Sequence, residues 1–129
     1  PIAAQLGADV PFFLYDQPML ATATGTDLET FPLELPYRIE LRLPGIHSST
    51  VGAYRALDYR QCDPDRDLRA VLQQPVSQWQ LHLVNDLEPP VFAQYPELAA
   101  IKAELYEQGA AYAAMSGSGS AVFGLFANG

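Results

Sequence analysis

The chain has 129 residues, of which 49% are hydrophobic and 17% are charged. This length fits one compact domain, and the composition excludes disordered and fibrous proteins. The net charge of −8 argues against nucleic acid or an anionic membrane as the main partner. No apolar run approaches the ~20 residues of a membrane span, and no secretory signal is expected. Cys62 is the single cysteine, which excludes a disulfide framework and a multi-cysteine metal site. These features together predict a cytoplasmic protein.

Both ends of the sequence resemble internal parts of a longer chain. Residues 1–6 are typical of the last turns of a helix, and Gly7 is typical of its left-handed C-terminal cap. The chain starts at Pro1 without Met and stops directly after an apolar run, residues 123–126. We therefore expect a piece of a longer protein.

The first half of the sequence predicts mainly strands. An apolar run at 10–14 precedes a strand at 19–24, which is broken at Gly25. In residues 37–43, Ile39, Leu41 and Leu43 alternate with charged side chains. This alternation predicts a half-buried strand with an apolar side and a polar side.

The second half predicts four helices and then two strands. Ser49 or Thr50 is the expected N-cap of a helix over 51–57, and a second helix is expected over 67–73. A third helix begins at Asn85, and a fourth begins at Pro96 and ends before the cap residue Gly109. Strands at 111–115 and 121–126 follow. The order of elements predicts an α+β fold with a mainly antiparallel sheet.

Asp9 is the first of three candidates for chemistry. It lies between the expected helix end and an apolar strand. A carboxylate at such a junction can be held by rigid elements while its oxygens face a cleft. The alternative is a turn aspartate that hydrogen-bonds to the local backbone.

The second candidate is the loop Ser116-Gly117-Ser118-Gly119-Ser120 between two apolar strands. Glycines and hydroxyls can turn backbone donors toward an anion, and the stretch contains no Lys or Arg. We expect both glycines to have a positive φ, or to admit an oxyanion where a Cβ would collide. The alternative is a hairpin loop of small residues, since the lysine of a P-loop is missing.

The third candidate is residues 44–54, which contain a strand end, a polar loop and the start of a helix. Helix N-termini favour anions and polar ligand groups. Thr50 and Tyr54 are four residues apart and therefore share one side of the helix. The alternative is an ordinary capped helix with Tyr54 half-buried in the core.

The remaining candidate side chains are expected to have structural roles. His47 and His82 lack metal-ligand neighbours, so no metal site is expected. Cys62 has no histidine partner for a nucleophilic role, and Trp79 is expected in the core. The arginines expected on a solvated helix face are those at 55, 60, 66 and 69.

The three candidates occur in one order together with two further motifs. The full set is Asp9-Val10-Pro11-Phe12-Phe13, Pro44 to Thr50 with Tyr54, Asn85-Asp86-Leu87-Glu88, Tyr95-Pro96-Glu97-Leu98 and Met115 to Ser120. With this combination the whole chain resembles the C-terminal half of the 4-diphosphocytidyl-2-C-methyl-D-erythritol kinases, within the GHMP kinase superfamily. The resemblance implies a GHMP kinase C-terminal domain with an antiparallel sheet of about four strands and helices on one face. It also implies that residues 1–30 are the tail of an ATP-binding domain and that residues 31–129 are the substrate-binding domain.

The same resemblance implies an activity, which is transfer of the γ-phosphoryl of ATP to the 2-hydroxyl of a cytidine-diphosphate substrate in non-mevalonate isoprenoid biosynthesis. Asp9 would be the base that accepts the hydroxyl proton, and residues 116–120 would lie beside the phosphate-transfer site. Thr50 and Tyr54 would line the cytidine pocket. ATP and Mg²⁺ would be bound mainly by an N-terminal half. The family's Gly-x-Gly-Glu stretch corresponds to residues 24–27, which depart from it and receive no role.

Two other functions stay open at this point. One is a GHMP kinase of the homoserine or mevalonate type, against which residues 44–54 argue. The other is a non-catalytic α+β binding or association module. A glycine-rich serine loop directly upstream of Pro1, with a lysine near the true N-terminus, would favour the kinase. The expected partner is a small molecule, with no nucleic acid or membrane, and the isolated chain is expected to be inactive and to self-associate.

Overall fold

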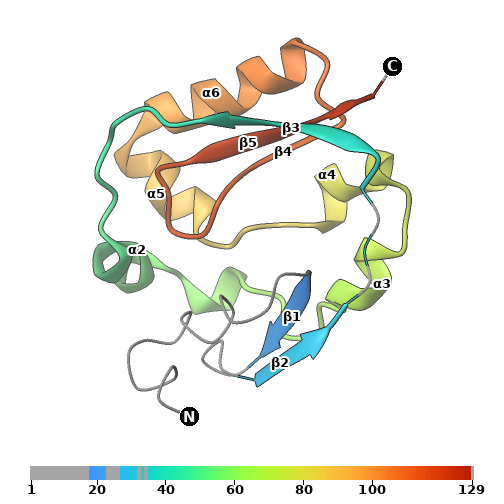
Figure 1. The fold of residues 1–129 in the computed structure, drawn as a ribbon. Helices are drawn as coiled ribbons and strands as arrows, with labels where there is room; N and C mark the ends of the chain where they lie inside the picture. Colours follow the sequence, from blue (N-terminus) through green and yellow to red (C-terminus); the bar gives the residue numbers. More distant parts are fainter. Residues whose placement is uncertain (1–17, 23–26, 32, 34, 129) are drawn as a thin grey trace, which may run out of the picture. The chain divides into compact units, whose positions relative to one another are not determined.

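The computed structural model describes residues 18–22, 27–31, 33 and 35–128 (Figure 1). They belong to two compact units, residues 1–35 and residues 36–129. In the first unit, β1 (Met19–Thr22) pairs antiparallel with β2 (Asp27–Thr30). The strand expected at 19–24 is therefore confirmed over 19–22, and β2 was not expected.

The second unit is built on a three-stranded antiparallel sheet with the order β3-β5-β4. Its strands are β3 (Tyr37–Arg42), β4 (Tyr112–Met115) and β5 (Val122–Ala127). Tyr37 pairs with Ala127, and Met115 pairs with Val122, so the central strand is the last one in the sequence. The expected α+β fold with an antiparallel sheet is confirmed, and its strands are divided between this sheet and the β1–β2 pair.

Seven helical segments complete the described part of the second unit. They are α2 (Thr50–Ala56), η2 (Tyr59–Gln61), α3 (Leu68–Leu72), η3 (Val76–Gln78), α4 (Trp79–His82), α5 (Glu88–Gln94) and α6 (Pro96–Glu107). The Ser49 side chain caps α2 by accepting the Gly52 N–H, and Asp67 caps α3 in the same way through Ala70 N–H. Gly109 follows α6 with a φ of 103°. No helix among the described residues has both the length and the apolar character needed to cross a bilayer.

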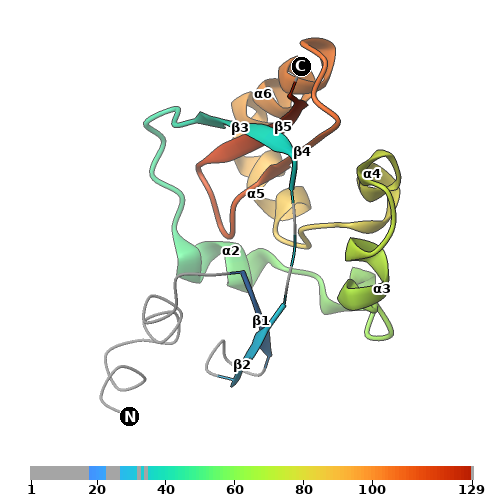
Figure 2. The ribbon, with the colours of Figure 1, turned by 45° about the vertical axis from the view of Figure 1, so that its right-hand side comes forward.

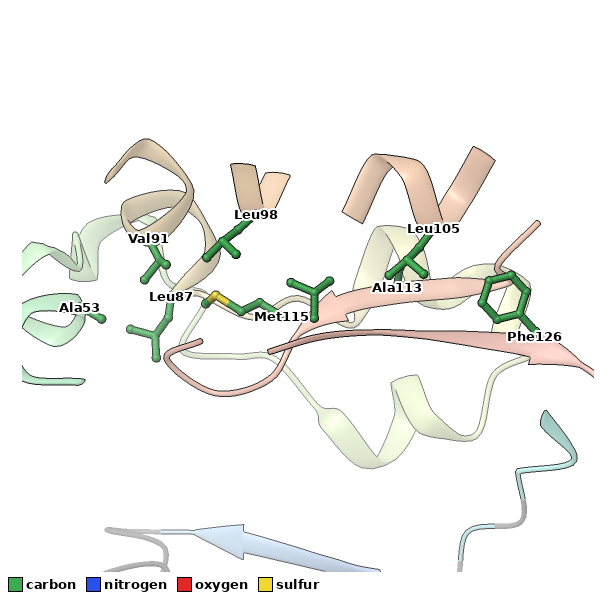
Figure 3. Packing of buried hydrophobic residues seen from close by; sticks show 9 residues of the cluster. Ala53, Leu87, Val91, Leu98, Leu105, Ala113, Met115 and Phe126 are labelled. Carbon is green, nitrogen blue, oxygen red and sulfur yellow. The ribbon is translucent and has the colours of Figure 1, made fainter. Parts of the chain in front are cut away.

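Helix α6 covers one face of the sheet over β4 and β5 (Figures 1 and 2). Leu98 and Leu105 of α6 are fully buried there, against Met115 and Phe126 of the strands (Figure 3). On the opposite face, the Trp79 ring packs edge-on against Tyr112 at a centroid distance of 5.8 Å. The core position expected for Trp79 is confirmed, since it is 3% exposed.

Strand β3 corrects one expectation. Its residues alternate between the two faces of the sheet as expected, but the apolar side chains Ile39 and Leu41 are 61% and 55% exposed. They lie opposite Leu125 and Phe123, on the face away from α6. Because β3 is an edge strand, the helices of the described residues do not reach this apolar strip.

The outer edge of β4 is closed by side chains instead of by a further strand. The Tyr106 hydroxyl donates to Ala113 O at 3.3 Å, and the Glu88 carboxylate accepts from Met115 N at 2.8 Å. Glu88 is 7% exposed and is paired with Lys102 Nζ at 2.6 Å. An unpaired strand edge would otherwise leave polar backbone groups without partners. These contacts hold the end of β4 at the point where the loop 116–120 begins.

Candidate functional site

The loop 116–120 and the segment before α2, two of the three segments singled out in the sequence, lie in direct contact. Ser48 Oγ donates to Ser118 O at 2.7 Å, and Thr50 Oγ1 lies 3.0 Å from Ser118 Oγ. Ser120 Oγ donates to Ile46 O. Both views of the ribbon show the β4–β5 turn reaching toward α2 (Figures 1 and 2). The fold therefore joins residues some 70 positions apart into one polar surface.

The two glycines of the loop have the expected positive φ, 55° at Gly117 and 87° at Gly119. At Gly117 an added Cβ would meet nothing within 4 Å. At Gly119 it would lie 3.0 Å from Met115 Sδ and 3.5 Å from Ser48 Cβ. Glycine is therefore favoured at position 119 by both the backbone conformation and the surroundings, whereas at position 117 it is favoured by the conformation alone.

Some hydrogen-bond donors of the loop have an acceptor within the described part of the protein, and others have none there and can bind a ligand. The Gly119 N–H donates to Ser116 O at 3.0 Å, and the Ser116 N–H donates to Ala121 O at 2.8 Å. The hydroxyls of Ser118 and Ser120 contact Thr50 and Ile46. Within residues 36–128, the structure gives no acceptor to the N–H groups of Gly117, Ser118 and Ser120. Backbone N–H groups grouped in this way are suited to phosphate oxygens.

Asn85 holds the loop from the side of α5. Its Nδ2 donates to Met115 O at 2.9 Å and to Gly117 O at 2.8 Å, while its Oδ1 accepts from Leu87 N at 3.0 Å. The sequence predicted Asn85 at a helix start, and its contact with the loop was not expected. An Asn three residues before the first turn of α5 is a signal for a bond to nearby backbone, such as the Leu87 N–H, but not for a contact with the distant loop.

Thr50 and Tyr54 lie one turn apart on α2. The buried residue of this helix is Ala53, at 6% exposed, whereas Tyr54 is 52% exposed. The Tyr95 hydroxyl donates to His47 O at 3.3 Å and holds the preceding loop. The Tyr54 ring is therefore open to a ligand rather than enclosed by the core. Asp9, the candidate base, lies outside the described residues.

A separate pocket of about 440 Å³ opens between the end of α2 and the start of α5. Leu57, Cys62 and Pro89 line it, beside an ion pair in which Arg66 donates to both carboxylate oxygens of Asp86 at 3.0 Å. This pair corrects the expectation that Arg66 lies on a solvated helix face. Burial raises the pKa of the Cys62 thiol, and the Asp86 carboxylate raises it further, so the thiol stays protonated at neutral pH. The described residues contain no group of three or more His, Cys, Asp or Glu side chains that could hold a metal ion.

Comparison with known proteins gives a consistent result. Residues 69–129 match the family described as GHMP kinases C terminal. The 4-diphosphocytidyl-2-C-methyl-D-erythritol kinase of Parabacteroides distasonis is 45% identical over 126 residues, which are 97% of this chain and 46% of that protein. The kinase of the same name from Porphyromonas gingivalis is 45% identical over 131 residues, again 97% of this chain and 46% of that protein.

A solved structure supports the same relationship. The crystal structure of a 4-(cytidine 5'-diphospho)-2C-methyl-D-erythritol kinase superposes with a TM-score of 0.81 and 35% sequence identity. The match covers 95% of this chain and 45% of that one. The chain thus spans just under half the length of the proteins that it matches.

Proposed function

Because residues 69–129 match the family described as GHMP kinases C terminal, we propose that the chain is the C-terminal part of an ATP-dependent 4-diphosphocytidyl-2-C-methyl-D-erythritol kinase. Residues 1–30 would end its ATP-binding domain, and residues 31–129 would form its substrate-binding domain. The enzyme would be cytoplasmic and would serve isoprenoid precursor synthesis. The observation that carries the proposal is the contact of Ser118 with Ser48 and Thr50, because it unites the expected phosphate loop with the expected substrate segment.

The proposed reaction is an in-line phosphoryl transfer. The 2-hydroxyl oxygen of the substrate attacks the γ-phosphorus of ATP, the bond to the β–γ bridging oxygen breaks, and ADP leaves. We assign the hydroxyl proton to the carboxylate of Asp9. Such reactions depend mainly on positioning and on stabilisation of charge. The N–H groups of Gly117, Ser118 and Ser120 are suited to the second task, as they are directed to no acceptor within residues 36–128.

On the acceptor side, we assign cytidine binding to Thr50 and Tyr54. A base can stack on an exposed aromatic ring with little dependence on hydrogen bonds, and the Tyr54 ring is 52% exposed. Thr50 Oγ1 contacts Ser118 Oγ, so the same helix turn connects the substrate segment to the phosphate loop.

Mg²⁺ neutralises the phosphate charge in kinases of this kind. The described residues contain no group of three or more His, Cys, Asp or Glu side chains that would hold Mg²⁺ without the substrate phosphates. We assign the metal and most of the ATP contacts to an N-terminal half, as the resemblance to the kinases implies.

The proposal is tested with the full-length protein, ATP and Mg²⁺. Three acceptor alcohols are compared, namely 4-diphosphocytidyl-2-C-methyl-D-erythritol, homoserine and mevalonate, and the phosphorylated position is identified by ³¹P NMR. We expect a kcat/KM for the cytidine substrate at least roughly 100-fold above the other two, which corresponds to about 2.7 kcal/mol of discrimination. A higher kcat/KM for homoserine or mevalonate would show that the protein is a GHMP kinase with that alcohol as its substrate. The absence of turnover with all three alcohols would favour the non-catalytic α+β binding module.

A further inference from the structure

We infer that Asn85 is a positioning residue, whose side-chain amide sets the direction of the Ser118 N–H donor in the loop 116–120. This inference rests on the proposed function, since the donors are taken to face the transferred phosphoryl group. Asn85 is assigned no contact with substrate, and it acts through the loop backbone.

The amide of Asn85 is fixed from both ends. Its two N–H groups donate to Met115 O and Gly117 O, at 2.9 and 2.8 Å. Its oxygen accepts the Leu87 N–H at 3.0 Å, within the turn that starts α5. Rotating the amide by 180° would place its oxygen against two carbonyl oxygens, so only one orientation satisfies all three contacts.

The contact with Gly117 O determines where the Ser118 N–H points. In a planar trans peptide the C=O and the following N–H point in opposite directions. With Gly117 O held toward Asn85, the Ser118 N–H is directed away from α5. The next peptide is held by Ser48 Oγ on Ser118 O, and its Gly119 N–H is used within the loop. Asn85 and Ser48 thus hold two successive peptides of the loop from different elements.

The role is separable from general stability. The end of β4 has a second anchor, because Glu88 accepts the Met115 N–H and is itself paired with Lys102. Loss of the Asn85 amide therefore leaves β4 attached to α5. What Asn85 alone supplies is the contact with Gly117 O, which lies in the loop and not in the strand.

The experiment compares Asn85→Asp and Asn85→Ala in the full-length protein. Asp keeps the shape and can still accept the Leu87 N–H, but its carboxylate cannot donate and repels both carbonyls. We expect kcat to fall about 10- to 100-fold with less than about a threefold change in the KM of the acceptor. Hydrogen exchange of the peptide covering 116–120 should accelerate, while exchange in β5 stays unchanged.

Gln108→Glu is the matched control, because it makes the same amide-to-carboxylate change in a side chain bonded to Arg42 and Glu104 on the surface. This control should keep both kcat and the exchange of the loop. The inference is overturned if folded Asn85 variants keep kcat and loop exchange, or if both variants unfold, since Asn85 is then a folding residue only. A wild-type protein that is inactive with every acceptor refutes the proposed function, while the exchange measurement still tests the hold of Asn85 on the loop.

Discussion

Gly119 has less room for a side chain than its neighbour Gly117. A Cβ there would meet Met115 Sδ at 3.0 Å, and the φ of 87° is one that L-residues rarely adopt. We predict that Gly119→Val abolishes activity of the full-length enzyme, whereas Ser116→Ala has a smaller effect. Gly117→Ala, with open space around its Cβ, should cost only the ~1–2 kcal/mol of a left-handed conformation. Activity and melting temperature are measured together, and full activity in folded Gly119→Val and Ser116→Ala would make the loop a plain hairpin.

The role of Asp9 is a second prediction for a single residue. In the full-length enzyme, Asp9→Asn should lower kcat by ~10²–10⁴-fold with substrate affinity nearly intact, because Asn keeps the shape but cannot accept the proton. Asp65→Asn is the control, since Asp65 lies in an exposed turn remote from the loop in sequence. Steady-state kinetics of the two variants decide the question. A kcat for Asp9→Asn within a factor of about two of wild type would make Asp9 a turn residue.

At the level of elements, Tyr112 connects β4 to the end of α4. Its hydroxyl donates to Leu83 O at 2.7 Å, and Tyr112 is buried, with 5% of the residue exposed. Burial raises the pKa of the Tyr112 phenol well above its usual range, and the Glu88 charge raises it further. A pKa raised by folding gives stability that is complete below the unfolded pKa of about 10 and is lost as pH rises above it.

We therefore predict that the chain loses stability above about pH 10 more steeply than its Tyr112→Phe variant. The variant should be less stable at pH 7 by about 1 kcal/mol, the usual contribution of one hydrogen bond. Urea unfolding at several pH values between 8 and 11 measures both effects. If the free energy of unfolding of the two proteins changes with pH in parallel, the pKa of Tyr112 is the same in the folded and unfolded states, and the prediction is wrong.

Sequence patterns predicted the elements whose signals are local. Ser49, Asp67 and Gly109 end or begin helices through contacts within a few residues, so their roles could be read directly. Helix α5 begins at Glu88, three residues after the expected start, because Asn85 uses its side chain in a turn and on the loop. The short α4 and η3 carry no long periodic pattern and were not expected.

Long-range features could not be predicted in this way. Alternation in β3 indicated which side chains share a face, but their burial depends on what packs there, and Ile39 remains 61% exposed. The glycine-rich loop and residues 44–54 were each recognised from their composition. Their contact through Ser118 depends on the strand order β3-β5-β4, which no local signal encodes.

For the whole molecule, we predict that the 129-residue chain alone transfers no phosphate from ATP. Its only lysine, Lys102, is paired with Glu88, and its described residues contain no metal-binding cluster. Three apolar residues, Ile39 and Leu41 of β3 and Leu43 just after it, are 55–73% exposed. This exposed apolar surface should also make the chain self-associate. ATP turnover by the pure chain would contradict the first claim, and a strictly monomeric species in sedimentation at high concentration would contradict the second.

The central claim is that this chain carries the cytidine-binding side of the enzyme, and Tyr54 tests it most directly. The measurement is the KM for the cytidine substrate, the KM for ATP and the melting temperature of full-length Tyr54→Ala, with Tyr54→Phe and the exposed Tyr59→Ala as controls. Stacking on a base contributes ~1–3 kcal/mol. We predict a roughly 10-fold higher KM for the cytidine substrate in Tyr54→Ala, the value expected for 1.4 kcal/mol, with the KM for ATP and both controls unchanged. Equal losses for both substrates together with a large drop in melting temperature would contradict the account.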